Sequence, residues 1–180
     1  MTNYFDKYLI KISELLKNVD SGNLEDVAKL ILRTNKNKKK IIIVGNGGSA
    51  AIASHASVDF TKTANIRAIN FNEADLLTCF SNDYGYENWV AKALEFYADR
   101  GDLIILISSS GTSKNIINGA KQSKKMNCPL ITFSGFKKNN PLSKLGIYNF
   151  WVNSRSYNFI ENTHQIWLLS IIDRIINIKV

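Results

Sequence analysis

Hydrophobic positions at the start of the chain recur at helical spacing. Over residues 3–19 apolar side chains return every three to four positions, and a second set does so over Leu24–Ile31. The polar segment Asp20–Asn23 separates the two sets, and the basic stretch Arg33–Lys40 follows the second. We expect that basic stretch to be a solvated loop before a strand. The pattern predicts an N-terminal helical pair over residues 1–38.

From residue 39 onward short apolar runs alternate with helical patterns. The runs are rich in Ile, Leu and Val without polar interruption, which is typical of strands buried on both faces of a parallel sheet. The strands are predicted at residues 41–45, 66–71, 103–108, 129–134 and 148–153. Helices are predicted at residues 49–62, 74–81, 88–98, 113–125 and 158–178. This alternation predicts an α/β fold: a three-layer, doubly wound sandwich with a five-stranded parallel sheet.

Composition narrows the class of protein. The 180 residues, 45% of them hydrophobic, fit one domain over residues 1–180, with the helical pair followed by an α/β core over 39–180. Two Cys and two His are too few for a disulfide framework or a cysteine-rich zinc module. No apolar run approaches the roughly 18 residues of a membrane span, and the N-terminus lacks a signal-peptide pattern. We therefore expect a soluble cytoplasmic protein without a membrane partner.

The net charge of +8 raises the possibility of a nucleic-acid partner. Part of this charge falls in the one stretch Arg33–Lys40, and no recognition-helix or aromatic-basic motif accompanies it. The abundance of Lys, Asn and Ile also fits a coding bias toward these residues. Nucleic acid is therefore not the expected partner.

A glycine-rich loop, Gly45–Ser49, follows the first predicted strand. Glycines let a ligand approach the backbone, and Ser49 is placed to cap the next helix. The loop also satisfies a dinucleotide pattern, but no acidic residue ends the next strand, so we predict no nucleotide cofactor. An anion site at a helix N-terminus and a plain capped turn both remain open.

A second loop, Ser108–Ser113, follows the strand over 103–108 and carries five hydroxyl groups around Gly111. Hydroxyl donors and free amides at a helix N-terminus suit a phosphate monoester. A Walker loop would need a lysine after its last glycine, at a spacing that this loop lacks. A generic Ser/Thr-rich loop is the other interpretation. Two loops suited to anions in one small domain favour a small polyhydroxy phosphate as ligand.

Five strings, in this order and spacing, resemble the sugar isomerase (SIS) domain family: VGNGGSA, SHASVDF, SNDYGYE, ISSSGTS and FIENTHQIW. Within that family the chain looks most like the phosphoheptose isomerases, which convert sedoheptulose 7-phosphate to an aldose heptose 7-phosphate for surface-polysaccharide precursors. The resemblance implies a flavodoxin-like sheet and a homotetramer with active sites at subunit interfaces. It also implies the following substrate-binding residues: Asn46, Gly47, Ser49, Asp83, Ser108, Ser109, Ser110 and Ser113.

Aldose–ketose isomerisation needs a base and an acid. His55 and Asp59 are four residues apart and share one face of the helix predicted at 49–62. By resemblance, Asp59 stands where the family has a glutamate base, and Glu161 stands where it has a glutamine. The family's catalytic histidine falls at Leu169, and His164 lies elsewhere on the helix. The catalytic candidates are Asp59, Glu161 and His164, with core packing and a solvated face as the other interpretations of His164 and Glu161.

Some family members bind zinc, and His55, Asp59 and Glu161 could supply three ligands for an open site.

Three functions stay open. The first is isomerisation of a phosphorylated sugar such as a heptose. The second is a non-catalytic phosphosugar-binding or regulatory protein. The third is a related enzyme that acts on a different sugar phosphate or on a nucleotide-linked sugar. Leu169 is the residue that separates the first from the others, because an aliphatic side chain cannot exchange protons.

Overall fold

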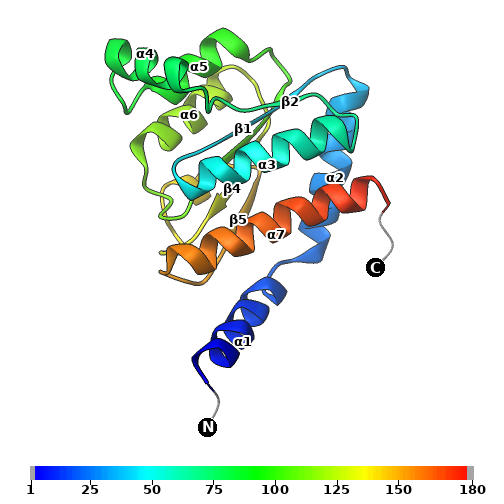
Figure 1. Ribbon diagram of the computed structural model, residues 1–180. Helices are drawn as coiled ribbons and strands as arrows, with labels where there is room; N and C mark the ends of the chain where they lie inside the picture. The colour runs from blue at the N-terminus through cyan, green and yellow to red at the C-terminus, as the bar shows by residue number, and fades with distance from the viewer. Residues whose placement is uncertain (1–2, 178–180) are drawn as a thin grey trace.

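A five-stranded parallel sheet forms the centre of the computed structural model, which describes residues 3–177 (Figure 1). The strand order is β2-β1-β3-β4-β5 and every neighbouring pair is parallel. The strands are β1 (Ile41–Gly45), β2 (Ala68–Ile69), β3 (Leu103–Ser108), β4 (Leu130–Ser134) and β5 (Tyr148–Trp151). The predicted fold class, with its five parallel strands, is confirmed.

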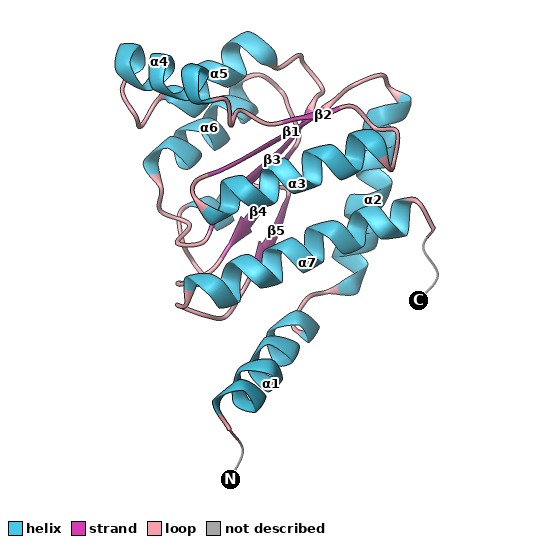
Figure 2. Ribbon diagram, in the orientation of Figure 1, coloured by secondary structure: helices cyan, strands magenta, loops and turns pink. Residues whose placement is uncertain are grey.

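Helices cover both faces of this sheet (Figure 2). Against one face lie α1 (Tyr4–Lys17), α2 (Ser21–Lys36), α3 (Gly48–Lys62) and α7 (Tyr157–Ile175). Against the other lie α4 (Ala74–Tyr84), α5 (Trp89–Tyr97), α6 (Lys114–Lys125) and a short 3-10 helix, Leu142–Lys144. The two faces bury separate apolar clusters, so the domain has three layers.

The two central strands explain why the sheet needs cover on both sides. Every residue of β1 and β3 is buried, and successive side chains point to opposite faces. Ile41 and Ile43 pack toward α3 and α7, whereas Ile42 and Val44 pack toward α5 and α6. The continuous apolar runs in the sequence follow from this double burial.

The chain changes direction across the sheet between β1 and β3. After β1 it passes through α3 to β2 on one side, and after β3 it passes through α6 to β4 on the other. Gly45 pairs with Ile107 at the end of this strand pair, so the segments after Gly45 and Ile107 leave the sheet side by side. In open α/β sheets such a switch point is where ligands bind.

Several predicted boundaries differ from the structure, and the helix expected over 74–81 continues as α4 through Tyr84. The strand expected over 66–71 is reduced to β2, Ala68–Ile69. The basic stretch Arg33–Lys40 is not all loop, because α2 continues through Lys36 with Arg33 and Lys36 in its last turn, where cations favour the helix dipole. The α2 helix also begins earlier than expected, since Asp20 caps it by accepting from the Gly22 amide. The last helix, predicted over 158–178, is α7 and ends at Ile175, while residue 178 itself lies outside the described residues.

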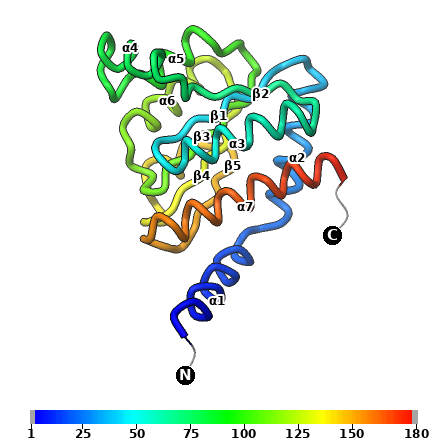
Figure 3. The backbone as a smooth tube through the Cα atoms, in the orientation of Figure 1, coloured from blue at the N-terminus to red at the C-terminus, as the bar shows by residue number. Residues whose placement is uncertain are grey.

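The first helix extends away from the body of the domain (Figure 3). It is attached to α7 through the Trp167 indole, which donates to the Leu16 carbonyl at 3.0 Å, and through a stacked pair of Tyr8 and Phe159. Tyr4 and Phe5 are more than 70% exposed. No helix within residues 3–177 has the length and apolar character needed to cross a membrane.

Candidate functional site

A polar cleft lies at the carboxyl ends of β1 and β3, at the switch point of the sheet. It has a volume of about 280 Å³. We call it the serine cleft, and its lining comes from the loop after β1, the loop after β3 and the start of α7. The lining residues are Asn46, Gly47, Gly48, Ser49, Ile107, Ser108, Ser109, Ser110, Ser113, Tyr157 and Glu161. The two loops predicted from the sequence therefore meet in one cavity.

The loop after β1 turns sharply into α3. A side chain at Gly45 would overlap the backbone of Ser49, and Gly47 adopts a φ of 55°, which favours glycine. Gly47 is itself the N-terminal cap of α3, and no side chain caps that helix. The prediction that Ser49 caps it is wrong, because Ser49 already lies inside the first turn, 2% exposed.

The loop after β3 is stabilised by hydrogen bonds among its own hydroxyl groups. The Ser108 hydroxyl donates to the Ser113 hydroxyl at 3.1 Å, and both the amide and the hydroxyl of Thr112 donate to the Ser110 oxygen, at 3.2 and 3.0 Å. Gly111 makes the turn with a φ of 65°. The loop ends at Ser113, the N-terminal cap of the twelve-residue helix α6. Hydroxyls and a helix N-terminus together make a site for an oxyanion.

Glu161 brings a carboxylate into the serine cleft from α7. The Ser109 hydroxyl donates to its Oε1 at 3.3 Å. Its Oε2 lies so close to Gly48 that a side chain at that position would overlap it. Gly48 thus leaves the space that the Glu161 carboxylate occupies, and Glu161 is the one carboxylate among the described residues that line the cleft.

His55 and Asp59 lie together but outside the serine cleft. His55 Nε2 is 3.2 Å from Asp59 Oδ2, as expected for residues four apart on one helix face. His55 Nδ1 faces Gln165 Nε2 at 3.4 Å, one helical turn beyond Glu161 on α7. The side chains of His55 and Asp59 are 49% and 34% exposed. The structure keeps this pair apart from the predicted third partner, Glu161.

The zinc prediction does not fit this arrangement. Within residues 3–177 no three His, Cys, Asp or Glu side chains gather in a group that could hold a metal ion. Glu161 instead faces Ser109 and Gly48, while His55 and Asp59 face solvent and Gln165. Within one chain the described residues therefore do not bring these three side chains together, and a bound zinc ion stays a prediction.

Comparison with known proteins decides the family. The SIS domain model matches residues 3–135. A phosphoheptose isomerase from Thermodesulfovibrio yellowstonii is 32% identical over 86% of this chain and 80% of its own length. One from Campylobacter concisus is 33% identical over 83% of this chain and 82% of its own length. The chain belongs to the phosphoheptose isomerases of the SIS domain family. The fold agrees: phosphoheptose isomerase from Neisseria gonorrhoeae superposes with a TM-score of 0.87 over 94% of this chain and 93% of that one, at 24% identity.

Within this SIS domain His164 belongs to the core and not to the cleft. Its side chain is fully buried beneath β4, with the ring edge against Phe133. Nε2 lies 3.0 Å from the Ser134 carbonyl oxygen, and Nδ1 has no hydrogen-bond partner among the described residues. Burial lowers the pKa of His164 to about 4, only partly offset by the Ser134 carbonyl. The predicted catalytic role of His164 does not fit this position, since the buried ring does not line the serine cleft.

The burial of His164 predicts a pH-dependent stability. The unfolded chain takes up a proton near pH 6.5, whereas the folded protein resists it down to about pH 4. Folding therefore loses about 3 kcal/mol as the pH falls through this window. Urea unfolding of the wild type and of His164→Leu at pH 7 and pH 4 measures the loss in the free energy of unfolding between the two pH values. The leucine variant should lack the part of this loss that comes from His164. His55→Leu should keep the wild-type difference, and an equal pH dependence in wild type and His164→Leu would contradict the assignment.

Two further positions named from the sequence lie outside the serine cleft. Asp83, at the end of α4, accepts from the Asn82 side chain at 2.9 Å and lies 3.7 Å from the Cys79 sulfur. It does not line the cleft of its own chain, and its place beside the sugar stays a prediction. Leu169 is partly buried and packs against the core cluster on the α3 face. The other seven predicted substrate-binding residues all line the cleft.

Sequence reasoning missed Tyr157 and Gly48 as parts of the site. Tyr157 begins α7 and lines the cleft while packing on Phe136. No motif pointed to it, because its place depends on how α7 returns over the sheet. Gly48 was visible within the glycine loop, but its close approach to Glu161 is a contact between segments more than a hundred residues apart.

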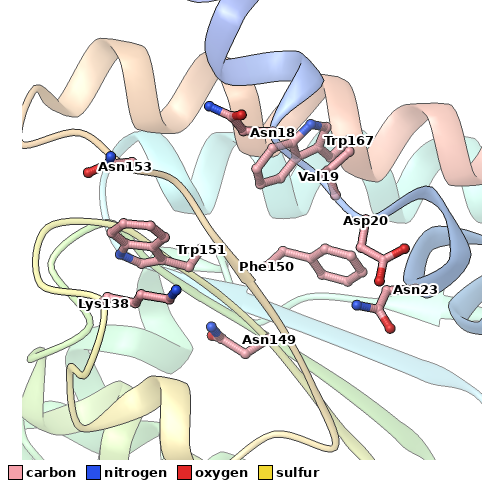
Figure 4. A pocket seen from close by; sticks show the side chains of 10 residues that line it. All are labelled: Asn18, Val19, Asp20, Asn23, Lys138, Asn149, Phe150, Trp151, Asn153 and Trp167. Carbon is pink, nitrogen blue, oxygen red and sulfur yellow. The ribbon is translucent and has the colours of Figure 1, made fainter.

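A larger groove runs beside the outer strand β5 (Figure 4). Its volume is about 580 Å³, and its walls come from the turn between α1 and α2, from β5 and from Trp167 of α7. Asn149, Trp151 and Lys138 line it, with Lys138 over the Trp151 ring. It contains none of the residues predicted for the site, so the smaller serine cleft is the candidate active site.

Proposed function

We propose that this protein is an aldose–ketose isomerase of a phosphorylated sugar, with sedoheptulose 7-phosphate as substrate. One observation carries the proposal: a hydroxyl-rich loop at a helix N-terminus and a carboxylate from α7 line the same cleft. The first group suits a phosphate and the second suits proton transfer at carbon. The named relatives support the reaction and the heptose, which would feed surface-polysaccharide precursors.

The phosphate would bind at the end of the cleft formed by Ser110, Ser113 and the start of α6. These hydroxyls and the helix N-terminus provide donors and positive potential for an oxyanion. The Ser109 hydroxyl, in contrast, contacts Glu161. Because a phosphate and a carboxylate repel each other, we expect the phosphate away from Glu161 and the reacting carbons close to it.

Glu161 would act as the base. It removes a proton from C1 of the ketose, the electron pair moves into an enediolate, and the same carboxylic acid returns the proton to C2. The hydroxyl proton passes from O1 to O2, so atoms and charge balance without a co-reactant. Asn46, which also lines the cleft, has a carboxamide N–H that can stabilise the negative oxygen of the enediolate. Glu161 would thereby do the work that the family divides between a glutamate at the position of Asp59 and a histidine at the position of Leu169.

A homotetramer remains a prediction, as do the active sites at subunit interfaces and the cytoplasmic location. Support for an assembly comes from α1, whose Tyr4, Phe5 and Leu9 side chains stay more than 60% exposed. Asp59 is not proposed as the base of its own chain's cleft, since it lies outside that cleft.

The experiment is a product assay with the purified protein. Sedoheptulose 7-phosphate, with fructose 6-phosphate and unphosphorylated sedoheptulose as comparison substrates, is incubated with the enzyme and followed by NMR. The proposal predicts an aldose heptose 7-phosphate from the first substrate and little turnover of the unphosphorylated sugar. Binding of sedoheptulose 7-phosphate without any aldose product would favour the non-catalytic alternative.

A further inference from the structure

Asn115 is a buried polar side chain that touches the lining of the serine cleft from behind. It lies in the first turn of α6 and is 2% exposed. Its Nδ2 donates to Asn46 Oδ1 at 2.8 Å, and its Oδ1 accepts from Asn46 Nδ2 at 3.0 Å. The two carboxamides thus form a reciprocal pair that ties the loop after β1 to the helix after β3.

The hydrogen bonds of Asn46 leave one group available to a ligand. A carboxamide has two N–H donors and an oxygen that accepts two hydrogen bonds. Asn115 uses one donor and one acceptor position, and the Tyr86 hydroxyl lies 3.4 Å from Asn46 Oδ1, at the second acceptor position. Since Asn46 lines the cleft, its remaining N–H is the donor that a bound sugar can meet.

We propose that Asn115 is a positioning residue that acts through Asn46 in the isomerase reaction. The reciprocal pair prevents the Asn46 carboxamide from rotating and holds its free N–H toward the sugar oxygen that becomes negative in the enediolate. A donor that is already oriented costs no reorganisation when the charge develops. The inference rests on the proposed function, because it assigns the sugar end of the same cleft.

Asn115 is not a phosphate ligand in this account. Its carboxamide is directed at Asn46 rather than at the hydroxyls of the loop after β3, and the side chain does not line the cleft. Its loss should therefore affect sugar turnover while phosphate binding to the serine loop stays the same. This separation is what makes the role testable.

The test is a double-mutant cycle with Asn115→Leu, which keeps the branched shape, and Asn46→Ala. We expect kcat/KM for sedoheptulose 7-phosphate to fall about 100-fold in Asn46→Ala and about tenfold in Asn115→Leu. In the Asn46→Ala background Asn115→Leu should cost less than about twofold more, because it acts only through Asn46. Calorimetric affinity for inorganic phosphate should be unchanged in both single variants.

Two results would overturn the inference. One is a tenfold loss that persists in the Asn46→Ala background. The other is an Asn115→Leu protein with a lowered melting temperature and weakened phosphate binding, which would mean a purely structural role. If the wild type does not isomerise the sugar, the proposed function fails separately. In that case the same double-mutant cycle is measured with the affinity for sedoheptulose 7-phosphate in place of kcat/KM, and it still decides whether Asn115 orients Asn46.

Discussion

Glu161→Gln is expected to slow isomerisation about 10³-fold, because the amide cannot accept the proton that leaves C1. The protein should stay folded, since glutamine has nearly the same shape and its amide oxygen can still accept from the Ser109 hydroxyl. Removing a negative charge from the cleft should also strengthen the binding of inorganic phosphate. Steady-state kinetics and phosphate calorimetry on the same preparations measure both effects.

The control for this variant is Asp173→Asn, which neutralises an exposed carboxylate on the same helix. It should keep the wild-type kcat and phosphate affinity. If Glu161→Gln retained the wild-type kcat, Glu161 would not be the base, and a residue outside the cleft described above would have to supply one.

Gly111→Ala is expected to disrupt the phosphate-binding end of the serine cleft. The φ of 65° at Gly111 disfavours any residue with a side chain, and the new methyl group would overlap the Asn140 carboxamide. Asn140 is 2% exposed, donates to Ser134 Oγ at 3.1 Å and accepts from the Ser143 amide at 2.9 Å. Displacing it should lower the free energy of unfolding by about 3 kcal/mol and phosphate affinity by at least about tenfold.

Gly101→Ala provides the matched control. Gly101 also has a positive φ, 89°, but an added methyl group there would meet only the Lys39 side chain, at an ordinary contact distance of 3.6 Å. Gly101 lies at the opposite end of the sheet, before β3. Urea unfolding should show a smaller loss than for Gly111→Ala and no change in phosphate affinity. Equal losses in the two variants would mean that backbone strain alone, and not Asn140, accounts for the effect.

The sequence was sufficient to predict the sheet and the two loops because their signals are local. Continuous apolar runs predicted β1 and β3, and the glycine and serine clusters directly after these runs predicted the two loops. The switch point then followed from the alternation of strands and helices, since the carboxyl ends of neighbouring parallel strands lie at one edge. The weakest strand prediction was β2, where only Ala68 and Ile69 pair with β1.

The spatial arrangement of the catalytic candidates could not be predicted from the sequence in the same way. Periodicity correctly placed His55 and Asp59 on one helix face, where they lie 3.2 Å apart. Which residues of α7 lie beside them depends on the axial offset between two helices, which no local pattern encodes. That offset puts Gln165 opposite His55 and puts Glu161 in the cleft. Likewise, nothing local distinguishes the buried His164 from an exposed histidine on the same helix.

The most direct test of the central claim is deuterium exchange in heavy water, with sedoheptulose 7-phosphate followed by proton NMR. If Glu161 transfers a proton between C1 and C2 in the serine cleft, the wild type should introduce deuterium at C1 of the recovered ketose and at C2 of the aldose product. Glu161→Gln should bind the sugar phosphate and introduce almost none. Exchange at the wild-type rate in Glu161→Gln, or tight binding by the wild type without exchange, would contradict the account.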